Sequence, residues 1–135
     1  FILDQKKRLL LQKRALNKYH SPGLWTNTCC SHPRDNEDVI DAGKRRLNEE
    51  MGMSASLDHL FSFIYKVNFD NGLIEHEFDH VLIGNSKTDP VINKAEVCDW
   101  KWVDIKNVKI DLADNSDMYT EWFKIIFEKL YYKLI

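Results

Sequence analysis

The sequence predicts an α+β fold, an α/β sandwich in which helices flank a mixed β-sheet. Three features indicate it: segments with apolar residues at every second position, one amphipathic segment that ends at a glycine, and an aromatic-rich apolar segment at the C-terminus. The first is typical of half-buried strands and the other two of helices. The predicted order is two strands, a loop, a helix, three strands and a helix, and the length suits one domain over residues 1–135.

The first third of the chain predicts a hairpin and a long loop. Residues 1–3 and 8–12 are mostly apolar and flank a polar turn. Residues 17–33 have no regular period and contain Pro22 and Pro33, so we expect a loop with short extended pieces. Since residues 1–3 have the pattern of the middle of a strand, we expect the natural protein to begin upstream of Phe1.

The first predicted helix follows this loop. Asp35 or Asn36 can cap its N-terminus, and apolar or small residues recur on one face up to Met51. Gly52 can end it in the left-handed conformation.

The remaining elements are predicted from alternation and turn residues. Residues 61–69 carry aromatic and branched side chains at odd positions, which is typical of a strand. Asp-Asn-Gly at 70–72 predicts a turn before a return strand over 73–84. Residues 99–103 predict another strand, and residues 118–134 predict the last helix.

Composition narrows the class of protein. A 44% hydrophobic and 30% charged chain is globular, and its net charge of −2 gives no basic field for nucleic acid. No apolar run has spanning length, so we expect no membrane partner. Three cysteines, two of them adjacent, indicate reduced thiols. Reduced thiols lead us to expect a cytoplasmic protein. We also expect a monomer or a weak dimer.

The run Trp-Thr-Asn-Thr-Cys-Cys-Ser-His-Pro at 25–33 carries unusual chemistry. It places Cys29, Cys30 and His32 within four positions, just before the predicted helix. A thiolate is a strong nucleophile or proton carrier, and a neutral imidazole is a common metal ligand. The run therefore indicates a reaction site.

The predicted helix carries paired charges near its C-terminus. Arg46 and Glu50 are four positions apart and share a face. The simpler interpretation is an ion pair within the helix. The functional one is a carboxylate that binds a divalent cation beside an arginine that binds phosphate oxygens.

A second acidic pair lies on the predicted return strand. Glu75 and Glu77 are two apart and project from one face, while His76 points away. A solvent-facing pair is one interpretation. The apolar residues that follow favour a central strand, where two carboxylates need a cation or a shared proton, and His32 could complete a site for Zn²⁺, Mn²⁺ or Mg²⁺.

Two aromatic residues have two interpretations. Tyr65 and Trp122 are most simply core residues of a strand and of the last helix. Near a carbocation, however, their ring faces would stabilise positive charge.

The spacing of charges around the helix resembles the Nudix box. The positions that fit are Glu37, Arg45, Leu47, Glu49, Glu50, Gly52 and Met53, with Ser31 at the first glycine position. Arg46 stands where the box has a carboxylate. Nudix hydrolases use helix carboxylates to bind Mg²⁺ and activate water against a diphosphate, so the resemblance implies a Nudix fold that holds a diphosphate without cutting it.

The whole chain resembles the type 1 isopentenyl-diphosphate delta-isomerases, which are Nudix-fold enzymes of isoprenoid biosynthesis. The resemblance is carried by Arg14, Lys18, Pro22-Gly23, the run 25–33, the segment 45–52, Tyr65, Glu75-His76-Glu77, Glu96, Trp102 and Trp122. It implies an enzyme that isomerises isopentenyl diphosphate to dimethylallyl diphosphate, with an allylic or homoallylic diphosphate as its small-molecule partner.

The resemblance also implies the roles of individual residues. It assigns catalysis to Cys30 rather than Cys29, and to Glu77, Tyr65 and Trp122. Diphosphate binding falls to Arg14, Lys18, Ser31 and Arg46. A tightly bound divalent metal (Mn²⁺, Zn²⁺ or Mg²⁺) is implied at His32, Glu75 and Glu77 with two histidines upstream of Phe1, and Mg²⁺ on the substrate diphosphate at Glu50.

The chemistry of this isomerisation needs two proton carriers. One proton is added to C4 and another is removed from C2, through a tertiary carbocation-like intermediate in a cavity that excludes water. We expect the Glu77–Tyr65 pair to donate the proton and the Cys30 thiolate to be the base, with the roles exchanged in the reverse direction.

Two other functions stay open. The first is a Nudix pyrophosphohydrolase that acts on a nucleoside diphosphate derivative, against which Arg46 and the run 25–33 both argue. The second is a non-catalytic module that binds a diphosphate or a metal.

Overall fold

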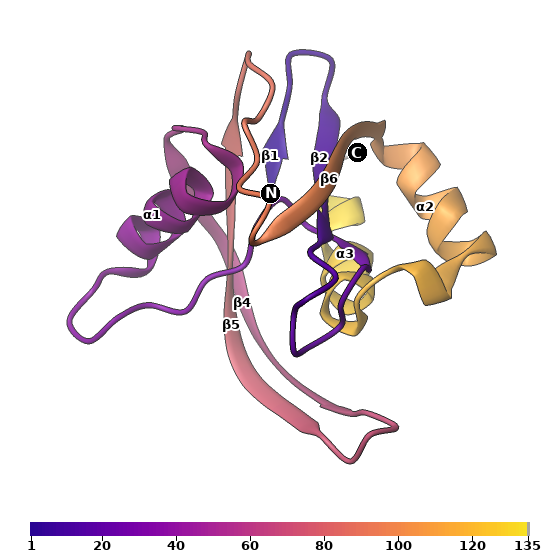
Figure 1. Ribbon diagram of the computed structural model, residues 1–135. Helices are drawn as coiled ribbons and strands as arrows, with labels where there is room; N and C mark the ends of the chain where they lie inside the picture. The colour runs from indigo at the N-terminus through magenta and orange to yellow at the C-terminus, as the bar shows by residue number, and fades with distance from the viewer. Residues whose placement is uncertain (135) are drawn as a thin grey trace.

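The computed structural model describes residues 1–134, apart from the side chain of Glu75, and shows one mixed sheet with helices on both sides (Figure 1). The elements in chain order are β1 (Ile2–Leu3), β2 (Arg8–Arg14), β3 (Trp25–Thr26), α1 (Val39–Met51), β4 (Leu57–Asn68), β5 (Ile74–Asn85), β6 (Val97–Asp104), α2 (Ile105–Asp114), a 3₁₀ turn (Ser116–Met118) and α3 (Glu121–Leu134). The predicted α+β class is confirmed.

The sheet has six strands in the order β3-β2-β1-β5-β4, and β6 also pairs with β2. β1 and β5 are parallel, and the other pairs are antiparallel. The parallel pair makes the sheet mixed. Among the described helices none is long and apolar enough to cross a membrane.

Alternation along β2 builds a core on each side of the sheet. Leu9 and Leu11 pack into the cluster that contains the apolar residues of α2 and α3, and Leu10 packs into the cluster under α1. All three leucines are fully buried. Successive residues of a strand face opposite ways, so one strand supplies both layers of the sandwich.

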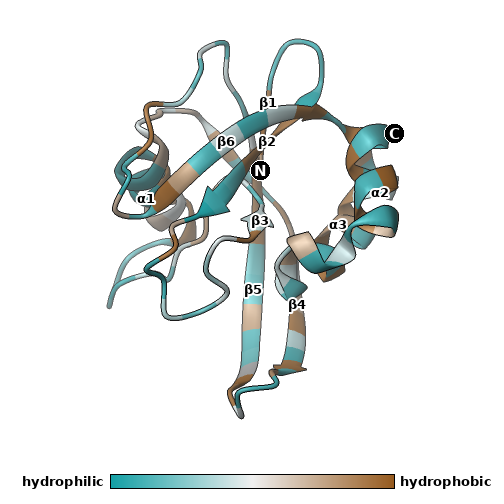
Figure 2. Cartoon of the chain, turned by 45° about the vertical axis from the view of Figure 1, so that its right-hand side comes forward, coloured by the Kyte–Doolittle hydropathy of each residue, from teal (hydrophilic) through white to brown (hydrophobic). Residues whose placement is uncertain are grey.

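The β4–β5 hairpin extends beyond the rest of the sheet (Figure 1). Within β5, only Gly84 and Asn85 at the far end pair with β1, so the earlier part of β5 pairs with β4 alone. The predicted central strand is therefore central only at its C-terminal end. The outward face of the hairpin keeps Ile64, Ile74 and Phe78 exposed, and hydrophobic residues appear near its tip in Figure 2.

The structure corrects two predicted boundaries and adds one helix. α1 is capped by Asp38, whose carboxylate accepts hydrogen bonds from the backbone N–H groups of Ile40 and Asp41, and not by Asp35 or Asn36. α2 was not predicted. The last helix begins at Glu121 and not at residue 118, because the hydroxyl of Thr120 accepts a hydrogen bond from the N–H of Phe123 and acts as its cap.

Glu37 ties the loop before α1 to the helix. Its carboxylate accepts two hydrogen bonds from the Arg45 guanidinium, at 2.9 and 3.0 Å. It also accepts one from the backbone N–H of Arg34. The hydrogen bonds from Arg45, and then that from Arg34, lower the pKa of Glu37 to about 2.

Glu37→Gln is expected to weaken the dependence of stability on acid pH. A carboxyl whose pKa is lower in the folded than in the unfolded state stabilises the fold above its unfolded pKa of about 4.3, and this contribution is lost as the pH falls toward 2. Urea unfolding between about pH 5 and pH 2 should show a shallower fall in the free energy of unfolding for Glu37→Gln than for wild type. The exposed Asp117, changed to Asn, is the control, and an identical slope in all three proteins would contradict the prediction.

Candidate active site

A cavity of about 410 Å³ lies between the loop after β3, the hairpin β4–β5 and the start of α3. Its walls include seven of the predicted site residues: Arg14, Cys30, Ser31, His32, Tyr65, Glu77 and Trp122. The structure thus brings together residues from five separate stretches of sequence.

The cysteine run is fixed to the centre of the sheet by Thr28. Its hydroxyl donates to the carbonyl of Leu10 and accepts from the N–H of Ile2, at 2.7 and 2.9 Å. Gln12, which is also buried, donates through Nε2 to the carbonyl of Thr28. These bonds hold the backbone that carries both thiols.

The two adjacent thiols face different surroundings. Cys29 packs against the core under α1, and Cys30 packs against the core formed with α3. Burial, and then the nearby Glu50 carboxylate, raises the pKa of Cys30 to about 11 and that of Cys29 to about 12. At neutral pH the resting side chain of Cys30 is therefore a thiol, and not the thiolate that was expected as the base.

Tyr65 and Glu77 are direct cross-strand partners. Tyr65 on β4 lies opposite Glu77 on β5 in the register of the hairpin, and both line the cavity. Directly opposed residues project from the same face of the sheet, within reach of each other. His76, the next residue toward the N-terminus, is exposed. The expected Glu77–Tyr65 pair is thus compatible with the register, whereas the side chain of Glu75 lies outside the described residues.

Trp122 closes the cavity from the first turn of α3. It is 8% exposed, and the Arg14 guanidinium lies 5.2 Å from the centroid of its ring. Arg14 also donates from Nε and Nη2 to the carbonyl of His20, at 3.1 and 2.9 Å. Trp122 therefore belongs to both the core and the cavity wall, and Arg14 holds the loop above it.

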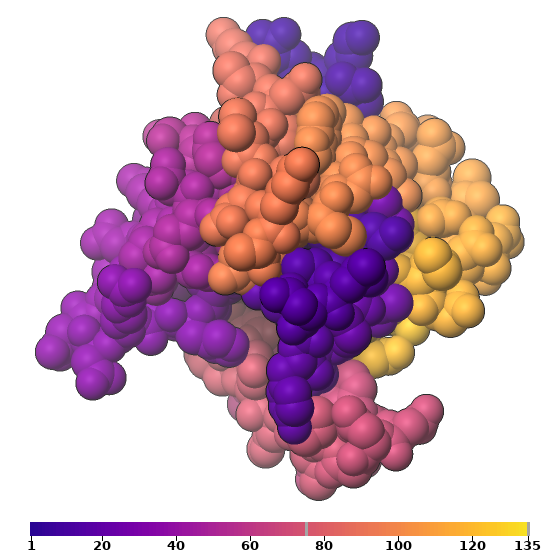
Figure 3. All heavy atoms as spheres, viewed as in Figure 1, coloured from indigo at the N-terminus to yellow at the C-terminus, as the bar shows by residue number. Residues whose placement is uncertain are grey.

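The loop over residues 15–24 reaches the hairpin tip. The ring of His20 makes an edge contact with Phe69, with 4.5 Å between centroids, and another with Trp122 at 6.1 Å. Figure 3 shows this indigo loop lying against the end of the hairpin. The sequence gives no local sign of this position of His20, because only folding places it beside Trp122.

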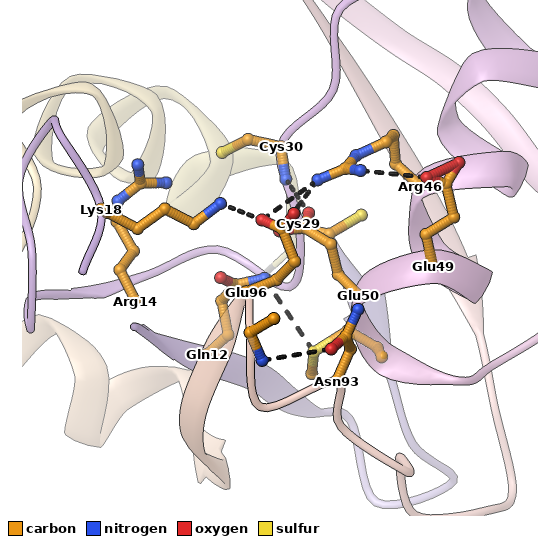
Figure 4. Close-up of polar contacts among 12 residues, drawn as sticks. Gln12, Arg14, Lys18, Cys29, Cys30, Arg46, Glu49, Glu50, Asn93 and Glu96 are labelled. Atoms are coloured by element: carbon orange, nitrogen blue, oxygen red, sulfur yellow. Dashed lines mark hydrogen bonds and ion pairs between the residues drawn. The ribbon is translucent and has the colours of Figure 1, made fainter. Parts of the chain in front are cut away.

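Three predicted residues lie in an ion-pair network next to the cavity (Figure 4). Lys18 and Arg46 both contact one carboxylate oxygen of Glu96, Arg46 at 3.5 Å. Arg46 also lies 3.4 Å from Glu50, which accepts a 3.4 Å hydrogen bond from the N–H of Cys30. Burial raises the pKa of Glu50, and Arg46 partly offsets this.

The network contains the ion pair between Arg46 and Glu50, which was the simpler of the two interpretations of these charges, and adds Glu96 to it. Glu96 matched the family in sequence but carried no role there. It contacts Lys18 and Arg46, two of the cations that the resemblance assigns to diphosphate binding.

Of the expected metal ligands, the structure describes the side chains of His32, Glu50 and Glu77 but not that of Glu75. His32 is exposed, and its carbonyl accepts from Arg45. Glu50 is engaged by Arg46 and by the N–H of Cys30. Among the side chains that the structure describes, no three or more His, Cys, Asp or Glu residues group closely enough to hold a metal ion.

Comparison with known proteins connects this site to a family. The NUDIX domain model matches residues 1–123. An isopentenyl-diphosphate Delta-isomerase 2 of Aromatoleum aromaticum is 50% identical over 130 residues, which cover 96% of this chain and 69% of that protein. The isomerase 2 of Photorhabdus laumondii is 50% identical over 133 residues, with 98% and 75% of the two chains covered.

Solved structures support the fold independently. The crystal structure of the MutT protein from Methanosarcina mazei has a TM-score of 0.79 at 18% identity and covers 98% of this chain and 88% of its own. The MutT NUDIX hydrolase from Burkholderia pseudomallei has a TM-score of 0.66 at 19% identity, over 94% and 93% of the two chains. At this identity the likeness shows the fold alone. With the matched domain, the two isomerases and the cavity around Cys30 taken together, the chain belongs to the isopentenyl-diphosphate delta-isomerase family of the NUDIX superfamily.

Proposed function

We propose that this protein converts isopentenyl diphosphate to dimethylallyl diphosphate by proton transfer at Cys30 and at the Glu77–Tyr65 pair. The observation that carries the proposal is the shared cavity: Cys30, Tyr65, Glu77 and Trp122 all line it. The relatives that are about half identical bear the name of this isomerase.

The reaction needs one group to protonate C4 and another to deprotonate C2. Cys30 enters the cavity from the loop after β3, and Glu77 enters from β5, so the two carriers come from different walls. In the conversion of isopentenyl to dimethylallyl diphosphate, the Cys30 thiolate takes the proton from C2. In the reverse reaction, the Cys30 thiol gives this proton back. Tyr65, opposite Glu77, relays or orients its proton.

The surroundings of these groups suit a cationic intermediate. The rings of Tyr65 and Trp122 line the cavity, and both residues are buried. An aromatic face stabilises a nearby cation.

The diphosphate would lie at the edge of the cavity, beside the ion-pair network. Lys18 and Arg46 converge on Glu96, and a substrate phosphate can take the place of this carboxylate as their anion. Arg14 and Ser31 line the cavity nearby and would complete the binding site.

Members of this family generally use divalent metals, and we propose two metal positions. His32, Glu75 and Glu77 would hold one ion (Mn²⁺, Zn²⁺ or Mg²⁺), and Glu50 would contact Mg²⁺ on the substrate diphosphate. Support comes from donor chemistry, since imidazole and carboxylate suit these ions. The side chains that the structure describes do not complete either site. We also propose a cytoplasmic monomer or weak dimer.

Proton exchange with solvent tests the proposal. In deuterated water, wild-type protein with isopentenyl diphosphate and a divalent metal should form dimethylallyl diphosphate that carries deuterium. A nucleotide panel run beside it should release no phosphate. Phosphate release without exchange would favour the pyrophosphohydrolase, and diphosphate binding with neither activity would favour a binding module.

A further inference from the structure

Asn27, the residue after β3, contacts four polar groups although only 8% of it is exposed. Its Nδ2 donates to the carbonyl of Cys29 at 2.7 Å. Its Oδ1 accepts from the hydroxyl of Thr26 at 2.8 Å, from Nε1 of Trp122 at 3.2 Å and from Sγ of Cys30 at 3.5 Å. One amide oxygen therefore touches both Cys30 and Trp122.

The orientation of this amide is fixed by its partners. The indole N–H of Trp122 can only donate, so the atom that faces it must be the amide oxygen. A backbone carbonyl can only accept, so Nδ2 must face Cys29. The sulfur of Cys30 consequently meets an acceptor, and its S–H bond points at Oδ1 of Asn27.

Asn27 is itself held by a directed chain of hydrogen bonds from α3. The hydroxyl of Thr26 gives its only hydrogen to Asn27, so Thr120 must be the donor in the 2.9 Å contact between the two threonines. Thr120 in turn accepts from the N–H of Phe123. Both threonines are fully buried. The chain joins the loop after β3 to the first turn of α3.

We propose that Asn27 is a positioning residue that fixes the Cys30 thiol and the Trp122 ring relative to each other at the cavity wall. Cys30 and Trp122 belong to segments far apart in the sequence, and they share this oxygen as a hydrogen-bond acceptor. A proton carrier must be held close to its reactive geometry, since a displacement near 1 Å costs on the order of 10²-fold in rate. The roles of Cys30 and Trp122 rest on the proposed function, whereas the contacts of Asn27 do not.

Asn27→Ala is expected to lower kcat by roughly 10²-fold and to leave KM and the affinity for inorganic pyrophosphate near their wild-type values. The tryptophan emission should also change, because the Trp122 indole loses its acceptor. The same emission change should be absent when Asn27→Ala is made in a Trp122→Phe background. Asn107→Ala on the exposed side of α2 is the matched control.

Asn27→Asp keeps acceptor oxygens for Trp122 and Thr26, and should retain the wild-type emission. Asn27→Asp is also the variant to measure if Asn27→Ala does not fold. Circular dichroism and thermal melting would detect such a loss of folding. Unchanged kcat with unchanged emission would overturn the proposal, and so would equal losses of kcat and pyrophosphate affinity, which indicate general disruption. A wild type without isomerase activity, but with the emission change in Asn27→Ala, would instead reject the proposed function and keep the contact.

Discussion

Cys30→Ala is expected to lower isomerase turnover by on the order of 10²–10⁴-fold while binding of inorganic pyrophosphate persists. The thiol lies in the cavity wall, and the substitution removes a proton carrier without touching the cations Lys18 and Arg46. The measurement is kcat from dimethylallyl diphosphate formation, with pyrophosphate affinity from calorimetry.

Cys29→Ala is the matched control, because it removes the same group one residue away. Cys29 packs against the core under α1, so the variant should lose some stability and remain largely active. Equal losses of activity in both variants would reject the assignment of Cys30 as the catalytic thiol.

Glu77→Gln is expected to lose both turnover, on the order of 10²–10⁴-fold, and tightly bound metal. The change keeps the shape of the side chain opposite Tyr65 but removes its negative charge and its capacity to take a proton. Turnover and metal content of the purified protein, by elemental analysis, are measured together. Stripping wild type with a chelator should reproduce the loss of activity, and added metal should restore wild type alone.

Two further variants sharpen this result. Tyr65→Phe keeps the ring that lines the cavity and removes only the hydroxyl, so it should reduce turnover and leave the metal in place. Asp58→Asn removes an exposed carboxylate from β4 and should change neither turnover nor metal content. Normal turnover with retained metal in Glu77→Gln would refute the shared role of Glu77 as proton carrier and ligand.

Most elements of the fold could be predicted because each has a local cause. Alternation predicts β4 and β5, and Asp-Asn-Gly predicts the turn between them, where Gly72 has a φ of 85°. Gly52 ends α1 with a φ of 61°, as expected. α2 was missed although Asp104 caps it and Val108 lies on its buried side, since its core partners are distant in sequence.

The site could be predicted in its residue types but not in its contacts. The motif around Cys30 and the acidic strand around Glu77 are readable from spacing, whereas their meeting in one cavity depends on how β5 and the loop after β3 pack. Asn27 and Glu96 show the limit clearly. Asn27 is hydrogen-bonded and Glu96 is ion-paired to a residue far away in the chain. The periodic pattern of apolar residues does not predict such contacts.

The three leucines of β2 have a consequence for how the molecule opens. Leu10 anchors one core and its neighbours Leu9 and Leu11 anchor the other, so the two layers are expected to melt as one cooperative unit. Thr28, in the cysteine run, is bonded to the backbone of Leu10 and of Ile2. Local fluctuations that displace Thr28 must therefore break bonds to the innermost strands. The loop that carries both thiols is therefore expected to open together with the sheet, although the loop itself contains neither a helix nor a long strand.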